Sequence, residues 1–215
     1  MKPNTKIYNV SRVEAGRLIN GKGNLDIWDK AIVLNDFASP WENTVIDDIE
    51  FRALHNSENL FFQFKVYDSK IHINQADNSY VSIGNSDRVE LFFRTNESLD
   101  PYYCLEIDPI SRMMDFKARP NKLFDYNWNW PKTDISIKSK ICKECFVVEV
   151  AISFFSLKAF NLIHDNIIEA GIFRAKYRKQ ECGAYKPTWI TWVNPLTEIP
   201  DFHGPTSFGR LKLEN

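Results

Sequence analysis

Residues 59–68 read NLFFQFKVYD, and this stretch decides the fold class. In an extended chain every second side chain points the same way, which groups Leu60, Phe62, Phe64 and Val66 on one side. The opposite side carries Phe61, Gln63, Lys65 and Tyr67. A period of two is typical of a β-strand with one buried face, and large Phe side chains suit the thick layer between packed sheets.

The same alternation recurs along the chain. It predicts further strands at residues 87–94, 102–108, 135–141, 146–152, 170–178, 188–193 and 208–213. Turn-forming runs such as GNSD at 84–87 separate them, and only residues 153–163 have helical spacing. The sequence therefore predicts an all-β fold, a two-sheet antiparallel, jelly-roll-like β-sandwich with one short helix. No repeat or linker divides the chain, so residues 1–215 are expected to form a single domain.

Charge and hydropathy exclude several partners. Lys and Arg number 27 against 28 Asp and Glu, which gives no electrostatic basis for nucleic acid or an anionic membrane. No apolar run approaches the roughly 20 residues of a membrane helix. The start, MKPNTKIY, lacks the apolar middle of a signal peptide. We expect a cytoplasmic protein as the sequence is written, or a secreted or periplasmic one if a leader was removed; the oligomeric state stays open.

The cysteines do not form a recognisable site. Cys142 and Cys145 make a lone C-x-x-C, and Cys104 and Cys182 stand far from them. A structural zinc site needs a second close pair, and a redox motif needs a following helix, whereas here a predicted strand follows. We interpret all of them as ordinary thiols.

Several segments stand in an order that resembles a known family. They read LINGKGNLDIW (18–28), NLFF (59–62), DRVELF (87–92), FVVEVAI (146–152), FRAKYR (173–178), WITW (189–192), DFHGP (201–205) and FG (208–209). Together they resemble the family 9 carbohydrate-binding modules and the related DOMON-type β-sandwiches, over nearly the whole chain. The resemblance implies non-catalytic binding of sugar ends or short oligosaccharides in polysaccharide breakdown, often beside a glycoside hydrolase domain.

A sugar site needs an aromatic ring for the C–H face of the pyranose and polar groups for its hydroxyls. The resemblance implies two Trp rings that sandwich the terminal sugar. At one of those places, close to Gly84, the nearest aromatic is Tyr80, and the other place is held by Phe202. The resemblance also places Glu90 as the acidic residue of the sugar-facing strand. A solvated strand carboxylate is the alternative for Glu90.

Further candidates lie near Phe202. His203 is its neighbour and could bond a sugar hydroxyl, or cap local backbone. Trp189 and Trp192 are three apart on a predicted strand, so they face opposite sides, and the resemblance favours Trp192 for the site. Arg178 ends its strand, where it could bond hydroxyls or pair with Glu90 or Asp201.

Trp128 and Trp130 form another aromatic pair. Their spacing of two puts both rings on one side of an extended loop, where they could replace the missing platform. The alternative is that they anchor the loop to the core. Trp41 carries the same ambiguity, whereas Trp28 is expected in the core.

The resemblance makes calcium possible, because family members often carry it and it prefers carboxylate oxygens. The scattered carboxylates are Asp36, Asp47, Asp48, Asp68 and Asp77. Two other functions stay open: a structural or protein-interaction β-sandwich with a degenerate sugar site, and a glycoside hydrolase using Glu90 and Glu106 on adjacent strands. A haem site at Met113 and Met114 is a weaker hypothesis.

Overall fold

The computed structural model describes residues 6–14, 16, 19–21, 23 and 26–215. Its strands are β1 Ile7–Arg12, β2 Ile49–His55, β3 Asn59–Val66, β4 Arg88–Arg94, β5 Tyr102–Ile107, β6 Met113–Arg119, β7 Leu123–Asp125, β8 Ile135–Ile141, β9 Phe146–Ser153, β10 Ile167–Lys179, β11 Tyr185–Thr191 and β12 Gly209–Leu213. The short helices are α1 Tyr80–Gly84 and α2 Phe154–Ala159, with 3-10 turns at Asp26–Lys30, Pro120–Lys122 and Pro205–Ser207. The start of the chain at residues 1–5, and part of the motif at 18–28, lie outside the described residues.

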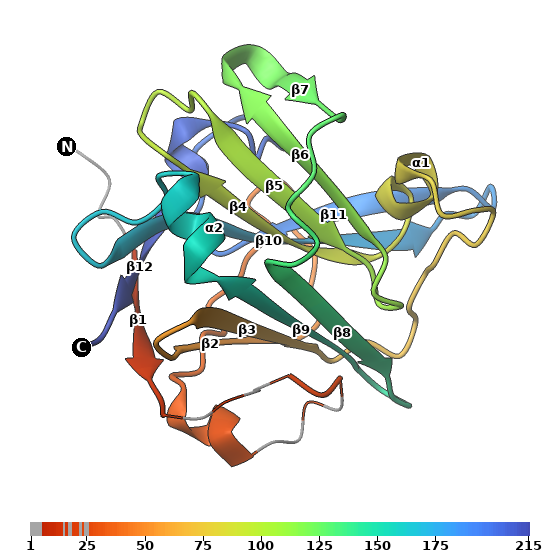
Figure 1. Cartoon of the computed structure of the whole chain (residues 1–215). Helices are drawn as coiled ribbons and strands as arrows, with labels where there is room; N and C mark the ends of the chain where they lie inside the picture. Colours follow the sequence, from red (N-terminus) through yellow and green to blue (C-terminus); the bar gives the residue numbers. More distant parts are fainter. Residues whose placement is uncertain (1–5, 15, 17–18, 22, 24–25) are drawn as a thin grey trace.

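The strands form one continuous 12-stranded sheet in the order β7-β6-β5-β4-β10-β12-β1-β2-β3-β9-β8, with β11 paired to β10 off this path. Strand β1 pairs in parallel with both β12 and β2, and the other pairings are antiparallel. The sheet curls so that β4, β5 and β10 lie over β3 and β9 (Figure 1). The all-β prediction is confirmed. Two separate sheets are not observed, because β1 joins both halves.

The main core fills the space inside the curl. The apolar face predicted for residues 59–68 points into it, with the Phe62 ring 6.0 Å from Phe93 of the opposite half. The other face of β3 is covered as well, because Phe61 packs with Trp28 and Leu54 in a smaller cluster. Trp28 is therefore a core residue, as expected.

Strand β4 is buried on both faces. Val89, Leu91 and Phe93 enter the main core, as their alternation predicts. The opposite face carries Phe92, which lies in an outer aromatic cluster with Phe173 of β10. We call this opposite side the outer face of β4. It holds the candidate site.

Several elements differ from the sequence prediction. Strands β1, β2, β6 and β7 and helix α1 were not predicted, because their apolar alternation is short or interrupted by charges. Met113 and Met114 lie on β6 and pair with β5. The predicted helix at 153–163 is shorter, and the Ser153 side chain caps its start. In the β8–β9 turn the Cys142 amide donates to the Cys145 carbonyl at 2.8 Å, and the cysteines are free thiols.

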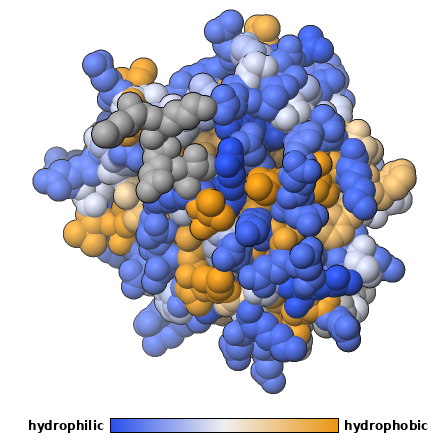
Figure 2. Space-filling view, turned by 90° about the vertical axis from the view of Figure 1, so that its left-hand side faces the viewer, coloured by the Kyte–Doolittle hydropathy of each residue, from blue (hydrophilic) through white to orange (hydrophobic). Residues whose placement is uncertain are grey.

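The surface is mostly polar. The face with β1 and β12, seen in Figure 2, carries apolar side chains in small groups among hydrophilic ones. Scattered apolar residues are normal on a solvated surface. Within the described residues, no helix has the length and apolar character to cross a membrane.

Candidate functional site

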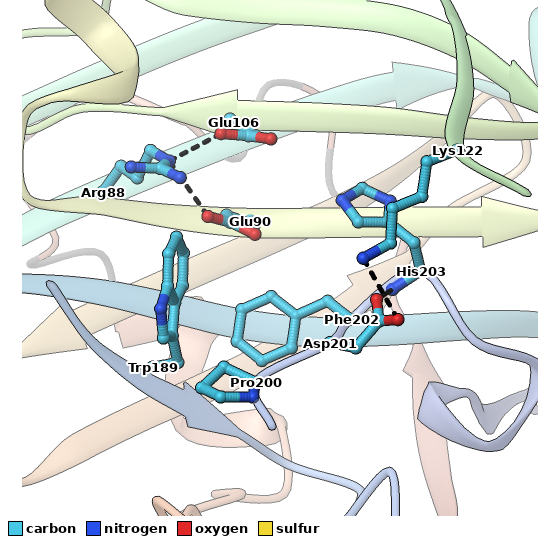
Figure 3. A pocket seen from close by; sticks show the side chains of 9 residues that line it. All are labelled: Arg88, Glu90, Glu106, Lys122, Trp189, Pro200, Asp201, Phe202 and His203. Atoms are coloured by element: carbon cyan, nitrogen blue, oxygen red, sulfur yellow. Dashed lines mark hydrogen bonds and ion pairs between the residues drawn. The ribbon is translucent and has the colours of Figure 1, made fainter. Parts of the chain in front are cut away.

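A buried charge cluster forms the floor of the candidate site on the outer face of β4. Glu90 on β4 lies opposite Glu106 on β5 in the sheet register. The Arg88 Nε lies 2.6 Å from Glu106 Oε2 and 2.9 Å from Glu90 Oε1 (Figure 3). Nε carries a single hydrogen, and it points to Glu106. Glu90 Oε1 is therefore in an ion pair with Arg88 but accepts no hydrogen bond.

Burial and like charge change the proton affinities of this cluster. Burial, and then the neighbouring Glu106 carboxylate, raise the pKa of Glu90. Burial also raises the pKa of Glu106, against the opposing effect of Arg88. One guanidinium cannot fully neutralise two adjacent buried carboxylates, so the raised pKa values favour a proton on this pair at neutral pH. Glu90 Oε1 keeps spare hydrogen-bonding capacity.

Aromatic rings form one side of the site. Trp189 from β11 and Phe202 from the following loop meet edge to face, with ring centroids 5.5 Å apart at 89°. The other face of Phe202 stacks on Phe173 at 4.1 Å. The Arg88 guanidinium lies 5.5 Å from the Trp189 ring. The rings make a corner and not a clamp, because a perpendicular pair at this distance leaves no slot for a sugar between them.

Polar side chains complete the rim opposite Trp189. Lys122 Nζ lies 3.2 Å from Asp201 Oδ2. Two residues further on, His203 is held by a 3.0 Å hydrogen bond between its Nδ1 and the Tyr102 hydroxyl. The His203 ring also stacks on Phe92 at 5.1 Å. Burial lowers the pKa of His203 to about 4, so the imidazole is neutral at physiological pH.

These groups enclose a small open pocket. It has a volume of about 160 Å³ and is lined by Arg88, Glu90, Glu106, Lys122, Trp189, Pro200, Asp201, Phe202 and His203. Figure 3 shows the ring of Trp189 beside the acidic floor, with Phe202 and Pro200 next to it. A flat apolar wall next to charged hydrogen-bonding groups can hold a pyranose ring by its C–H face and its hydroxyls together.

The structure brings three predicted site residues together, namely Glu90, Phe202 and His203. It separates others from them. Trp192 is only 2% exposed in the main core and packs so closely on Gly209 that a Cβ there would lie 2.5 Å from its ring. The expectation that Trp192 is the exposed member of its pair is therefore corrected. Its strand neighbour Trp189 lines the pocket.

The Trp128 and Trp130 pair anchors a loop to the core. Trp130 is 1% exposed, and its indole nitrogen donates to Ser156 Oγ at 3.0 Å. Trp128 is partly buried against Tyr103 and Phe160, with centroids 4.9 Å and 5.4 Å away. The structure thus selects the loop-anchor alternative for their packing.

Arg178 also lies elsewhere. Its guanidinium donates to the Val45 carbonyl at 3.2 Å and lies 4.0 Å from Asp47. The expected pairing with Glu90 or Asp201 is wrong, because Arg88 and Lys122 occupy those carboxylates. Arg178 is the last but one residue of β10 and lines a different basin.

Sequence reasoning missed Arg88 and Lys122 and chose against Trp189. The signal for Trp189 lay in the strand itself, since Trp192 shares its parity with Ile190, a residue typical of a core. Near Gly84, where no second ring was found, the Gly84 carbonyl accepts a hydrogen bond from Arg88 Nη1 at 2.7 Å. This segment positions Arg88.

The carboxylates do not form a hydrolytic pair or a calcium site. Glu90 and Glu106 lie side by side on one guanidinium, whereas a glycosidase places its two carboxylates across the scissile bond. Asp68, the most buried calcium candidate, is neutralised by Arg174 and Lys176. Across the described residues no three His, Cys, Asp or Glu side chains are grouped to hold a metal. The carboxylates that the structure describes therefore do not fit calcium.

Comparisons with known proteins give the family and the fold of the chain. A family model described as "Carbohydrate family 9 binding domain-like" matches residues 19–215. No curated protein matches the chain in sequence. A solved structure described as a "putative carbohydrate-binding protein" from Bacteroides uniformis ATCC 8492 is 17% identical, with a TM-score of 0.73 over 98% of this chain and 100% of that chain.

Two further structures are of a family 9 carbohydrate-binding module from Caldicellulosiruptor kristjanssonii. The complex with glucose is 16% identical, with a TM-score of 0.63 over 97% of this chain and 96% of that one. The complex with cellotriose is also 16% identical, with a TM-score of 0.60 over 97% and 94%. At these identities the likeness shows a shared fold.

Proposed function

Because the chain belongs to the carbohydrate family 9 binding domain-like family, a family of non-catalytic carbohydrate-binding modules, we propose that its sugar site is the pocket bounded by Trp189, Phe202 and Glu90. The single observation that carries this assignment is the juxtaposition of the partly buried Trp189 indole with a buried, incompletely hydrogen-bonded carboxyl group, Glu90. Neither feature serves the core. Together they match the two faces of a pyranose.

Each group has a distinct part in the proposed binding. The Trp189 ring covers the C–H face of the sugar and removes apolar surface from water. Glu90 and Arg88 bond hydroxyls at the floor through charge-assisted hydrogen bonds, and Asp201 and His203 bond those at the rim. Phe202 supports the corner, because its own face is already used against Phe173.

The size of the pocket favours one sugar ring at the end of a chain. The volume of about 160 Å³ is small, and the Trp189–Phe202 corner closes one side. Because a shallow site with one stacking ring buries little surface, we propose a weak affinity, in the range of about 0.1–1 mM. The glucose and cellotriose seen with the Caldicellulosiruptor module are suitable probes.

Calorimetric titration with glucose and cellotriose tests the assignment. We expect wild type to bind both, and Trp189→Ala to lose at least about tenfold in affinity, as a central aromatic anchor does. The matched control is Trp128→Ala, which truncates another partly buried indole, one packed against the main core. Loss in Trp128→Ala alone would overturn the assignment. Absence of binding by folded wild type would favour the alternative of a structural module with a degenerate site.

We also propose that the curled sheet is a jelly-roll-like β-sandwich in its packing. The support is the contact across the interior, where residues of β3 and β9 meet those of β4 and β10 in one core. The outer face of β4 would then be the sugar-facing surface of one layer. Phe93→Ala tests whether the two halves of the sheet depend on each other for stability.

A further inference from the structure

A second and larger basin lies at the end of the β10–β11 hairpin. Its volume is about 670 Å³, and its lining includes Lys70, Arg178, Lys179 and Tyr185. None of these residues belongs to the pocket at Trp189. The basin combines positive charge with an exposed aromatic ring, and the proposed function does not use it.

The charge of the basin is unbalanced toward the positive. Its lining has the cations Lys70, Lys176, Arg178 and Lys179 and the anions Asp47 and Asp68, so four positive charges less two negative leave two positive. Asp68 forms ion pairs with Lys176, at 2.6 Å, and with Arg174.

Lys176 is itself saturated, because it also donates to the Lys70 carbonyl at 2.6 Å and to Asp87 at 3.0 Å. Its ammonium has three donors, and all are used. Within the described part of the chain, the side chains of Lys70 and Lys179 have no hydrogen bond or ion pair. The surplus charge thus lies on Lys70, Lys179 and Arg178.

Arg178 has an unused donor. Its Nε is buried and has no hydrogen-bond partner, while Nη2 donates to the Val45 carbonyl. The nearest carboxylate, Asp47, is 4.0 Å away and also contacts Arg174. An unsatisfied N–H on a guanidinium is costly, and an anion with two oxygens is the group that satisfies its fork.

Tyr185 supplies a flat, fixed surface beside these cations. It is 43% exposed, and its covered face stacks on His72 at 3.5 Å between centroids, with an angle of 17°. Tyr177 also packs against His72, with ring centroids 5.9 Å apart. A ring held in this way loses little entropy when a ligand stacks on its free face.

We propose that this basin binds an anionic sugar residue. The carboxylate or sulfate of the ligand bonds Arg178 with help from Lys70 and Lys179, and its pyranose ring stacks on Tyr185. The proposal stands apart from the site at Trp189, which presents acidic groups at its floor and suits a neutral sugar. The protein would then hold two different sugar types, as they occur in an acidic heteropolysaccharide.

An NMR titration of the whole chain with methyl glucuronide, compared with methyl glucoside, tests this proposal. We expect glucuronide to shift the backbone amides of Arg178 and Tyr185, and glucoside at equal concentration to leave them in place. Raising NaCl from about 0.05 M to about 0.5 M should weaken glucuronide binding, because exposed charges are screened. Shifts of these amides with both sugars, or with neither, would overturn the proposal.

Two variants test the charged part and the aromatic part of the basin separately. Arg178→Gln should weaken glucuronide binding by roughly tenfold through loss of a charge-assisted bond, and Tyr185→Ala should weaken it severalfold. The matched control is Arg210→Gln, on β12, whose side chain is 41% exposed against 37% for Arg178. Both residues are accessible, so the variants should fold.

Inorganic sulfate is the final probe, because it separates an anion site from a sugar site. We expect it to bind more weakly than glucuronide and to be unaffected by Tyr185→Ala. If sulfate matches glucuronide and Tyr185→Ala changes neither, the sugar part of the proposal fails. Binding of glucose at Trp189 is measured separately, so failure here leaves the proposed function untouched.

Discussion

Strand β4 presents two buried faces of opposite chemistry. Toward the main core it turns Val89, Leu91 and Phe93, each with no exposed surface. On the outer face it carries Arg88 and Glu90, which are 5% and 1% exposed. Burial of a charge is costly unless it is paired, whereas burial of Phe93 is favourable. The inner face stabilises the fold, whereas the charged end of the outer face, at Arg88 and Glu90, is where we propose that the sugar binds.

The largest expected effect comes from a substitution on the inner face of β4. Phe93→Ala removes a ring that contacts Phe62 at 6.0 Å and Trp130 at 6.1 Å, so it should lower the free energy of unfolding by about 3–5 kcal/mol. Urea denaturation measures the loss. Sugar affinity of the remaining folded protein should be unchanged. An affinity loss without a stability loss would mean that the two faces are not separate in role.

The next effect concerns the stability of the fold at low pH. The pKa of His203 in the fold, about 4, lies below its ordinary value of 6.5, so the unfolded chain takes up a proton first as pH falls. The stability from this group is complete above pH 6.5 and is lost as pH falls toward 4, by about 3 kcal/mol.

The control for this pH dependence is His203→Gln, whose side chain cannot titrate. Its free energy of unfolding should fall less steeply than that of wild type over this window. Equal slopes would show that His203 is accessible to protons in the fold.

A smaller effect separates binding from stability on the outer face. Glu90→Gln replaces a carboxyl group whose pKa is raised to about 8 by burial and by Glu106, so the free energy of unfolding at pH 7 should stay equal or increase. Above pH 8, where the carboxyl group of the wild type is ionised, affinity for glucose should fall about fivefold in the variant, because a neutral amide bonds a hydroxyl less strongly than a carboxylate does. Destabilisation with unchanged affinity would make Glu90 a structural residue.

The smallest effect lies at the rim. Lys122→Ala breaks an ion pair with Asp201 whose partners are 50% and 26% exposed. Exposed pairs contribute little, so both stability and sugar affinity should change by less than about 1 kcal/mol. Calorimetry and thermal unfolding of this variant check both values. A larger affinity loss would place Lys122 in direct contact with the sugar.

Sequence alternation predicted the inner face well and the outer face poorly. Val89, Leu91 and Phe93 follow from a period of two, and the order of motifs led to the family. The parity of Trp192 with the core residue Ile190 pointed to Trp189 for the outer face, but the family resemblance favoured Trp192 and led to the wrong choice. Periodicity could not find Arg88, since a basic residue beside a strand turn is usually solvated.

The curl of the sheet was beyond prediction for a different reason. Strand β1 joins the two halves by pairing in parallel with both β2 and β12, contacts between residues far apart in the chain. Local patterns carry no information about such pairing. The Trp128 and Trp130 loop shows the same limit, because its anchor, Ser156, comes from α2.

The indole N–H signals of the six Trp residues offer the most direct test of the sugar site. In an NMR titration with cellotriose, the account predicts that the Trp189 signal moves furthest, while those of Trp130 and Trp192 in the main core stay in place. A fixed Trp189 signal, with movement at Trp128 or in none of the indoles, would contradict the assignment of the pocket on the outer face of β4.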